Sequence, residues 1–299
     1  MCKCGTLKEA NVESLEFNGN YYNMTICPIC KFVETTPKIF SEINIYEFGH
    51  YEVKPYFFIP VFINLFDFIL TRIHFYILKL SKTNKLLDFG CGKGYFLYFL
   101  KKIGFTDLSG VETSESRSAF ARKITNLEIS SDFYSGGKIL GKVYNGVTMI
   151  HVLEHIKNPF DFLDILLDSG VEKNGFVYIE VPNIGSVSSK IAGHAWAHFT
   201  PHFHTNHFSI ASFENYCKER KFKYKLFATF SFYNSAMGMS SALFSLFGYR
   251  GSIFEDMKKK KLIVIIPFIL LLPVTIILEF LLSFFSKKGS VIKIAIKRL

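Results

Sequence analysis

Hydrophobic and polar positions along this chain predict strands that alternate with helices. The clearest unit is KLLDFGCGKGYFL at residues 85–97. An apolar run at 86–89 precedes three closely spaced glycines, and apolar positions from 96 to 103 then recur at helical spacing. The pattern predicts a strand, a tight glycine turn and a helix, which together form the opening unit of an open α/β sheet.

Later segments predict the remainder of such a sheet. The nearly continuous apolar run at 144–152 is typical of a buried parallel strand. Short helical patterns separate the apolar runs, as expected when parallel strands are joined by helices on both faces of a sheet. The other expected strands cover 107–112, 175–181, 223–233 and 290–298.

The segments before residue 85 predict two smaller parts. Residues 31–54 are polar and predict a connector, while the aromatic stretch at 55–80 predicts helices that cover the sheet. Asp67, Arg72 and His74 interrupt that stretch and argue against a membrane span. We therefore expect a Cys-rich module and connector at 1–54, an aromatic helical cover at 55–84 and the α/β domain at 85–299.

The most apolar segment, residues 262–285, lies between Lys258–Lys261 and two further lysines at 287 and 288. Hydropathy alone predicts one membrane-spanning helix. The chain must nevertheless return to the sheet, and Pro267, Pro273 and Glu279 interrupt the segment. We therefore predict a bent, membrane-seeking helical hairpin or interfacial helices within 258–288, lying on the membrane. A hairpin at a homodimer interface and a true span are the alternatives.

Charge and the N-terminus narrow the possible partners. A net charge of +10 over 299 residues indicates an anionic partner, such as a nucleotide-linked substrate, a membrane surface or a nucleic acid. No nucleic-acid-binding signature stands out, so we expect no nucleic acid. The first ten residues have no apolar core, so we expect no secretory signal and a cytoplasmic protein associated with the inner face of the membrane.

Four of the six cysteines form two close pairs near the N-terminus, Cys2 with Cys4 and Cys27 with Cys30. Four thiolates suit a tetrahedral structural zinc ion, and CPIC at 27–30 has the spacing of a zinc knuckle. The first pair has one intervening residue instead of the usual two. Four thiols without a metal are the alternative.

The glycine turn at 90–94 lets a ligand lie directly on the backbone, because glycine has no Cβ. A dinucleotide site has the spacing G-x-G-x-x-G. Here the third glycine, Gly94, comes one residue early, Tyr95 follows it, and Asp88 precedes the first glycine. These differences argue against a nicotinamide oxidoreductase. The turn resembles motif I of class I S-adenosylmethionine (SAM) methyltransferases, whose ligand carries an ammonium and a sulfonium.

A second motif strengthens the resemblance. The sequence HVLEHIKNPFDFL at 151–163 is similar to the fourth-strand segment of the ubiquinone and type 11/12/23 branches of that family. The resemblance implies a seven-stranded Rossmann-like sheet whose last strand inserts between strands five and six. It also implies residues that bind SAM: Asp88, Gly90, Cys91, Gly92, Gly94, Glu112, Asp132, Phe133 and His151.

Individual roles follow from the same resemblance. Glu112 ends the second strand, where such folds use a carboxylate to accept hydrogen bonds from the ribose hydroxyls; the alternative is an acid that stabilises a helix N-terminus. Asp132 and Phe133 correspond to residues that contact the adenine. His151 should lie beside the methionine portion of SAM.

A hydroxyl acceptor benefits from a general base that removes its proton, and histidine is suited to that role near neutral pH. The catalytic candidates are therefore residues that could act as this base or support it. Glu154 and His155 follow the fourth strand; they are either catalytic or a structural pair at that corner. The segment 194–208 contains five histidines. It resembles the loop that covers the acceptor, with His202 in contact with the acceptor and Trp196 and Phe203 packing; a structural loop anchored by its aromatic residues is the alternative. A metal site there is possible, although no carboxylate is interspersed.

We therefore predict a SAM-dependent methyltransferase. The basic charge, the zinc-like module and the apolar segment favour a lipid-linked saccharide of cell-surface glycan synthesis as acceptor. A quinone-like lipid acceptor and a non-catalytic scaffold that binds SAM or membranes are the alternatives.

Overall fold

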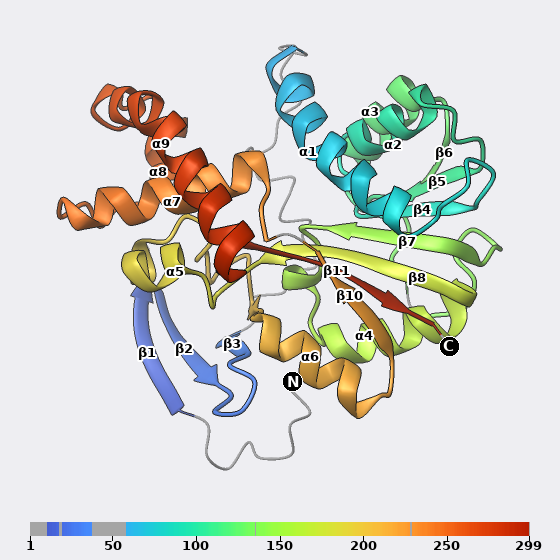
Figure 1. Cartoon of the computed structure of the whole chain (residues 1–299), viewed down its shortest axis with the longest axis horizontal. Helices are drawn as coiled ribbons and strands as arrows, with labels where there is room; N and C mark the ends of the chain where they lie inside the picture. Colours follow the sequence, from blue (N-terminus) through green and yellow to red (C-terminus); the bar gives the residue numbers. More distant parts are fainter. Residues whose placement is uncertain (1–10, 18–19, 38–57, 135, 228, 299) are drawn as a thin grey trace. The chain divides into compact units, whose positions relative to one another are not determined.

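The computed structural model describes residues 11–17, 20–37, 58–134, 136–227 and 229–298 of the chain. Its largest element is a seven-stranded sheet with strand order β10-β11-β8-β7-β4-β5-β6 (Figure 1). The neighbours from β6 to β8 pair in parallel. The strands are β4 (Leu86–Phe89), β5 (Leu108–Val111), β6 (Glu128–Ser130), β7 (Tyr144–Ile150), β8 (Val171–Pro182), β10 (Lys223–Leu226) and β11 (Val291–Lys297).

This topology confirms the predicted α/β sheet. The last strand, β11, lies between β8 and β10, the position expected for the seventh strand. The helices that follow strands are α2 (Tyr95–Lys102), α3 (Glu115–Thr125), α4 (Pro159–Ile165), which continues as a π-turn at Leu166–Gly170, and α6 (Ile210–Glu219).

The chain divides into two compact units. The first unit comprises Met1–Ile39, Val181–Tyr216 and Leu226–Lys293, and the second comprises Phe40–Glu180, Cys217–Lys225 and Ile294–Leu299. The boundaries predicted at residues 54 and 84 are not tested by this division and stay predictions.

In the second unit, α1 (Phe58–Ile77) is the helix expected in the aromatic stretch. Phe68 packs against Phe99 with ring centroids 5.1 Å apart. Phe75 meets Tyr178 of β8 edge-on at 5.7 Å. His74 is buried, and its Nδ1 lies 2.8 Å from the Tyr178 hydroxyl oxygen. The aromatic residues of α1 therefore build a packed contact with the sheet, as predicted.

The first unit contains a small antiparallel sheet that the sequence did not reveal. Its order is β1 (Asn11–Phe17), β2 (Asn20–Ile26), β3 (Val33–Thr36) and β9 (Asn206–His207). Strand β3 lies in the segment predicted as a polar connector, so that prediction is wrong for 33–36. The polar composition of this segment suggested a connector. Only Val33 and Thr35 of the strand are buried, and four residues show too little periodicity for a strand to be recognised.

Trp196, for which the resemblance implied a packing role in the covering loop, packs against its own unit. It is buried in the core of the first unit with Met24, Phe199, Met239 and other apolar residues. The indole is therefore part of the core that joins the small sheet to the helices of this unit.

The helices of the first unit are α5 (Val187–Ala192), α7 (Phe232–Leu246), α8 (Ile253–Lys258) and α9 (Leu262–Ser286). The strand predicted over 223–233 is shorter than expected, because β10 ends at Leu226 and α7 begins at Phe232. Alternating Phe residues produced the strand pattern, yet Phe227 and Phe230 are both buried in the connection between the two elements.

The predicted helical hairpin at 258–288 is wrong. Residues 262–286 form one continuous helix, with Pro267 and Pro273 inside it. Each proline removes one backbone hydrogen bond. Breaking the helix in so apolar a segment would leave many more backbone groups without partners, so the prolines are tolerated. Among the described residues, α9 is the one helix long and apolar enough to cross a membrane by length and composition.

Candidate functional site

The glycine turn after β4 lies in the second unit and adopts a conformation that favours glycine. Gly90, Gly92 and Gly94 have φ angles of 73°, 56° and 75°. The amides of Gly90 and Cys91 donate to the Val111 carbonyl at 2.8 and 2.9 Å, which holds the turn against β5. A Cβ at Gly92 would meet the Arg117 guanidinium at 3.2 Å and otherwise only the edge of the Glu112 carboxylate. The turn is therefore a backbone cradle on its Gly92 side.

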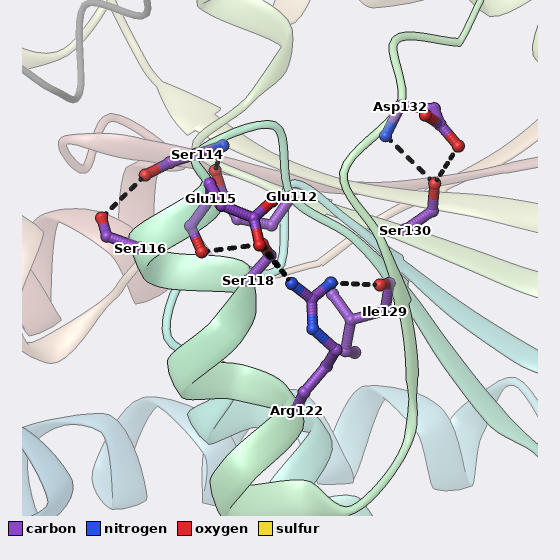
Figure 2. A network of polar contacts seen from close by, with 9 residues as sticks. All are labelled: Glu112, Ser114, Glu115, Ser116, Ser118, Arg122, Ile129, Ser130 and Asp132. Carbon is purple, nitrogen blue, oxygen red and sulfur yellow. Dashed lines mark hydrogen bonds and ion pairs between the residues drawn. The ribbon is translucent and has the colours of Figure 1, made fainter.

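Glu112 stands directly after β5 and is fixed at this cradle. It is 4% exposed, its Oε2 accepts from the Gly92 amide at 2.8 Å, and its Oε1 accepts from the Ser114 amide at 2.9 Å. Arg117 Nη1 lies 3.9 Å from Oε2. Each carboxylate oxygen has two lone pairs, so one on each remains for a further donor such as a hydroxyl. Figure 2 shows Glu112 at the start of α3 beside Ser114.

Asp88 is buried one strand away, in β4. It accepts a hydrogen bond of 2.6 Å from the Thr148 hydroxyl of β7. Burial raises the pKa of Asp88 to about 7, the Thr148 hydrogen bond opposes that rise, and the negative charge of Glu112 adds to it. A cation placed nearby would favour the ionised carboxylate.

Cys91 contributes to the turn through its backbone. Its side chain is buried under the turn, where a Cβ on Gly110 of β5 would lie 2.9 Å from its sulfur. Burial raises the pKa of the Cys91 thiol well above its ordinary value. The thiol is therefore a packing group, and the amide of Cys91 is the part that shapes the turn.

Asp132 and Phe133 follow β6. The Asp132 amide donates to Ser130 Oγ at 3.1 Å, and that hydroxyl donates to Asp132 Oδ2 at 3.0 Å, as Figure 2 shows. In the same view Arg122 of α3 bonds both the Glu115 carboxylate and the Ile129 carbonyl, which ties α3 to β6. Phe133 is 80% exposed. An apolar ring that stands free of the protein is available to pack on a flat ligand.

His151, just after β7, lies between two buried acids. Its Nδ1 is 3.3 Å from Glu154 Oε1 and its Nε2 is 3.4 Å from Glu180 Oε1. Desolvation alone lowers the pKa of His151, but the two carboxylates outweigh it and raise that pKa to about 10. The residue has a left-handed φ of 54°, and its amide donates to the Glu180 carbonyl at 2.8 Å. His151 is therefore an imidazolium near neutral pH and no proton acceptor.

Comparison with known proteins identifies the family. A model of the methyltransferase domain family matches residues 62–225, more than half of the chain. The chain belongs to this methyltransferase family. The matched range contains the glycine turn, Glu112 and the 151–163 motif, so the predicted class, a class I SAM-dependent methyltransferase, is confirmed.

Solved structures of methyltransferases are among those that match this chain. The plantazolicin methyltransferase BpumL, bound to a triazolic analogue and S-adenosylhomocysteine (SAH), is 19% identical with a TM-score of 0.50, over 81% of this chain and 86% of that one. A SAM-dependent methyltransferase from Archaeoglobus fulgidus is 18% identical with a TM-score of 0.46, over 77% and 92% of the two chains. Coclaurine N-methyltransferase is 12% identical with a TM-score of 0.48, over 77% and 72%. No curated protein matches the sequence.

The structure places the predicted catalytic residues of the methyltransferase in different units. Glu154 and His155 lie on a 3₁₀ turn, Leu153–His155, directly after His151 in the second unit. Glu154 is 1% exposed and pairs with His151, whereas His155 is half-buried. His202 belongs to the first unit, where its ring packs on that of Phe203 with centroids 3.9 Å apart. The assignments of catalytic roles stay predictions.

The other histidines of the 194–208 segment have partners within the first unit. His198 Nε2 lies 2.7 Å from the Asn234 carbonyl oxygen, and His204 Nδ1 lies 2.7 Å from the His198 carbonyl oxygen. His207 Nε2 is 3.1 Å from the Thr35 hydroxyl, and its ring stacks on Phe199. These contacts hold the segment in the fold of the first unit.

Two residues around the methyltransferase site escaped the sequence reasoning, Thr148 and Glu180. Threonine is common in buried strands, so Thr148 does not stand out in the sequence. Its contact with Asp88 becomes evident only from the register of β7 with β4, in which the two residues pair. Glu180 is the last but one residue of the apolar run GFVYIEV at 175–181. An acid at the carboxyl end of a buried parallel strand is a signal that could have identified it.

Proposed function

We propose that this methyltransferase transfers the methyl group of SAM to a lipid-linked saccharide at the cytoplasmic face of a membrane. The observation that carries the choice of acceptor is α9, a helix of 25 residues whose most apolar 18-residue stretch is only 22% buried. An enzyme with so much exposed apolar surface is suited to a substrate that is held in lipid.

The cradle fits SAM. SAM supplies an electrophilic methyl group on a sulfonium. Gly92 has no Cβ that would keep a ligand from the backbone, and Glu112 offers one lone pair on each oxygen to the two ribose hydroxyls. Asp132 and the exposed Phe133 ring would hold the adenine. Asp88, ionised by a neighbouring cation, and the buried pair of Glu154 and Glu180 supply negative charge for a ligand with an ammonium and a sulfonium.

Proton removal from the acceptor is assigned to histidine. His151 is excluded as a base because both ring nitrogens face carboxylates. Its place after β7 instead fits a group that orients the methionine carboxylate. Glu154 acts through His151, as a positioning residue. His155 and His202 remain the proposed bases for a hydroxyl acceptor.

The proposal is tested by incubating the purified enzyme with radiolabelled SAM in detergent. Lipid-linked saccharides, nucleotide sugars and quinone-type lipids are offered separately. We expect label in the lipid-linked saccharide, less in His155→Ala or His202→Ala, and none in Glu112→Ala. Label in quinones alone would favour the alternative acceptor. SAM binding without transfer to any fraction would favour a non-catalytic scaffold. If neither histidine variant lowers turnover, the assignment of the base is wrong.

We also propose a structural zinc ion on Cys2, Cys4, Cys27 and Cys30. Cys2 and Cys4 lie outside the described residues. Cys27 and Cys30 lie on a tight turn after β2 in which the Lys31 amide donates to the Cys27 carbonyl, and both thiols are buried. Two thiols on such a turn supply half of a tetrahedral site.

One zinc ion per chain is therefore expected by plasma emission spectrometry. Chelation, or the double variant Cys27→Ser/Cys30→Ser, should release it and lower the melting temperature. Cys217→Ser serves as a control for zinc content alone, because Cys217 is on α6, remote in sequence from both pairs, but is itself fully buried. Metal-free protein that melts at the same temperature as zinc-loaded protein would refute the zinc site.

A further inference from the structure

Helix α9 turns nearly all of its polar residues inward and a broad apolar face outward. Its fully buried positions are Val264, Phe268, Thr275, Glu279 and Ser283, so every polar residue of the helix except the terminal Ser286 faces its own unit. The apolar side chains that face outward are Leu262, Ile263, Ile266, Ile269, Leu270, Val274, Ile277, Phe280, Leu281, Phe284 and Phe285. A surface helix in water has the opposite arrangement.

The buried polar residues fix the rotation of the helix about its axis. Glu279 is 0% exposed and accepts from the Ser290 amide at 2.9 Å and from the Ser290 hydroxyl at 2.5 Å. The Ser283 hydroxyl lies 2.9 Å from that of Thr229. Turning the apolar face inward would break these hydrogen bonds and leave buried polar groups unsatisfied. The outward apolar face is therefore a stable feature of the unit.

Charge at both ends of this face indicates what covers it. Lys258–Lys261 precede the helix, and Lys287 and Lys288 follow it. Lys259, Lys260, Lys287 and Lys288 are exposed. Apolar side chains flanked by lysines are suited to the boundary between acyl chains and anionic headgroups. We propose that α9 lies in the plane of a bilayer that contains anionic lipids, with its outward face in the acyl region and its lysines among the headgroups.

The packing of α9 explains why it lies in the plane. Near its start, Val264 and Phe268 pack with Phe244 of α7 and Ile253 of α8. After its end, the Val187 amide donates to the Lys288 carbonyl at 3.1 Å. The stripe from Val264 to Ser283, about 28 Å at 1.5 Å per residue, therefore has protein along one side. A spanning helix would need lipid or apolar protein on every side, and Glu279 would then lie inside the bilayer.

A second copy of the chain fits the same face less well. Both ends of α9 are basic, so two copies packed through this face would bring lysines together in either orientation. Like charges across an interface weaken association. Anionic lipid complements both ends at once.

Co-sedimentation with large unilamellar vesicles tests the proposal. The full-length protein should bind vesicles of phosphatidylcholine and phosphatidylglycerol at least tenfold more tightly than phosphatidylcholine alone. The outward-face triple variant Ile269→Ser/Leu270→Ser/Phe284→Ser should lose at least tenfold in affinity. The basic triple variant Lys259→Gln/Lys260→Gln/Lys288→Gln should lose the preference for phosphatidylglycerol.

Matched controls change exposed residues elsewhere. Tyr21→Ser/Ile29→Ser/Tyr224→Ser removes exposed apolar groups, and Lys138→Gln/Lys173→Gln/Lys218→Gln removes three exposed charges. Neither should alter binding. The proposal is wrong if the protein binds neither kind of vesicle, or if it forms a dimer that the outward-face variant abolishes.

Orientation is read from tryptophan variants in brominated lipid. Leu270→Trp and Phe284→Trp should be quenched best by bromine at the same shallow depth, with the buried Trp196 as a constant background. If the tryptophan at position 270 were quenched best by deeply placed bromine and the tryptophan at position 284 by shallow bromine, α9 would span the bilayer. Methylation is assayed in detergent, so the two proposals can fail separately. Vesicle binding without methylation of the lipid-linked saccharide would refute the proposed acceptor but not the role of α9. Methylation of that acceptor without vesicle binding would refute the role of α9 but not the acceptor.

Discussion

Replacing Glu112 with alanine should weaken SAM binding at least a hundredfold. The carboxylate accepts from Gly92 and Ser114 and has one lone pair per oxygen left, to which we propose that the ribose hydroxyls donate. A hydrogen bond to a charged group contributes about 1.5–3 kcal/mol. Losing two of them corresponds to roughly a hundredfold in affinity or more, since each 1.4 kcal/mol is about tenfold. Calorimetric titration with SAM and with SAH measures the change.

Two further variants separate binding from folding. Glu112→Gln preserves the shape but removes the charge, so it should bind with intermediate affinity. Glu115→Ala removes an exposed carboxylate three residues later that pairs with Arg122 (Figure 2), and it should bind SAM as the wild type does. All three proteins are melted in parallel. Wild-type affinity in a folded Glu112→Ala protein would show that the carboxylate does not hold the ribose.

The sequence was informative wherever local chemistry determines the structure. The strand–turn–helix unit at 85–97 was predictable because three glycines, an apolar run and a helical period occur in immediate succession. The position of Glu112 was predictable because neighbouring parallel strands end at the same edge of a sheet. A carboxylate after the second strand therefore lies beside the turn after the first. The place of β11 followed from the family resemblance, and the structure confirms it.

Features that depend on distant partners were not predictable. The orientation of α9 depends on hydrogen bonds between Glu279 and Ser290 and between Ser283 and Thr229. No local sequence pattern reveals these partners. Hydropathy and two prolines indicated a broken hairpin, whereas the buried polar stripe belongs to one continuous helix. His151 was placed beside the ligand by resemblance, but its charge state depends on Glu180, which lies 29 positions later in the sequence.

Replacing Gly94 with alanine should destabilise the fold by about 2–5 kcal/mol. A left-handed residue with a Cβ costs about 1–2 kcal/mol, and Gly94 has a φ of 75°. Its Cβ would also lie 2.8 Å from the Ala121 Cβ and 3.1 Å from the Ala121 Cα on α3. Overpacking of this kind costs about 1–3 kcal/mol. The melting temperature should fall by about 3–8 °C, as differential scanning fluorimetry would show.

Matched glycines isolate the two causes. Gly141 has a φ of 70°, and a Cβ added there would meet nothing within 4 Å, so Gly141→Ala carries the backbone strain without the overlap and should lose about half as much or less. Gly92→Ala carries the same backbone strain, and its Cβ would lie 3.2 Å from the Arg117 guanidinium beside the Glu112 carboxylate, so it should weaken SAM binding as well as stability. Adding Ala121→Gly to Gly94→Ala should restore part of the lost stability, because it removes the Cβ that overlaps. Equal melting temperatures for the Gly94 and Gly141 variants, with no rescue by Ala121→Gly, would show that the close approach of α2 and α3 at this turn is not what requires glycine.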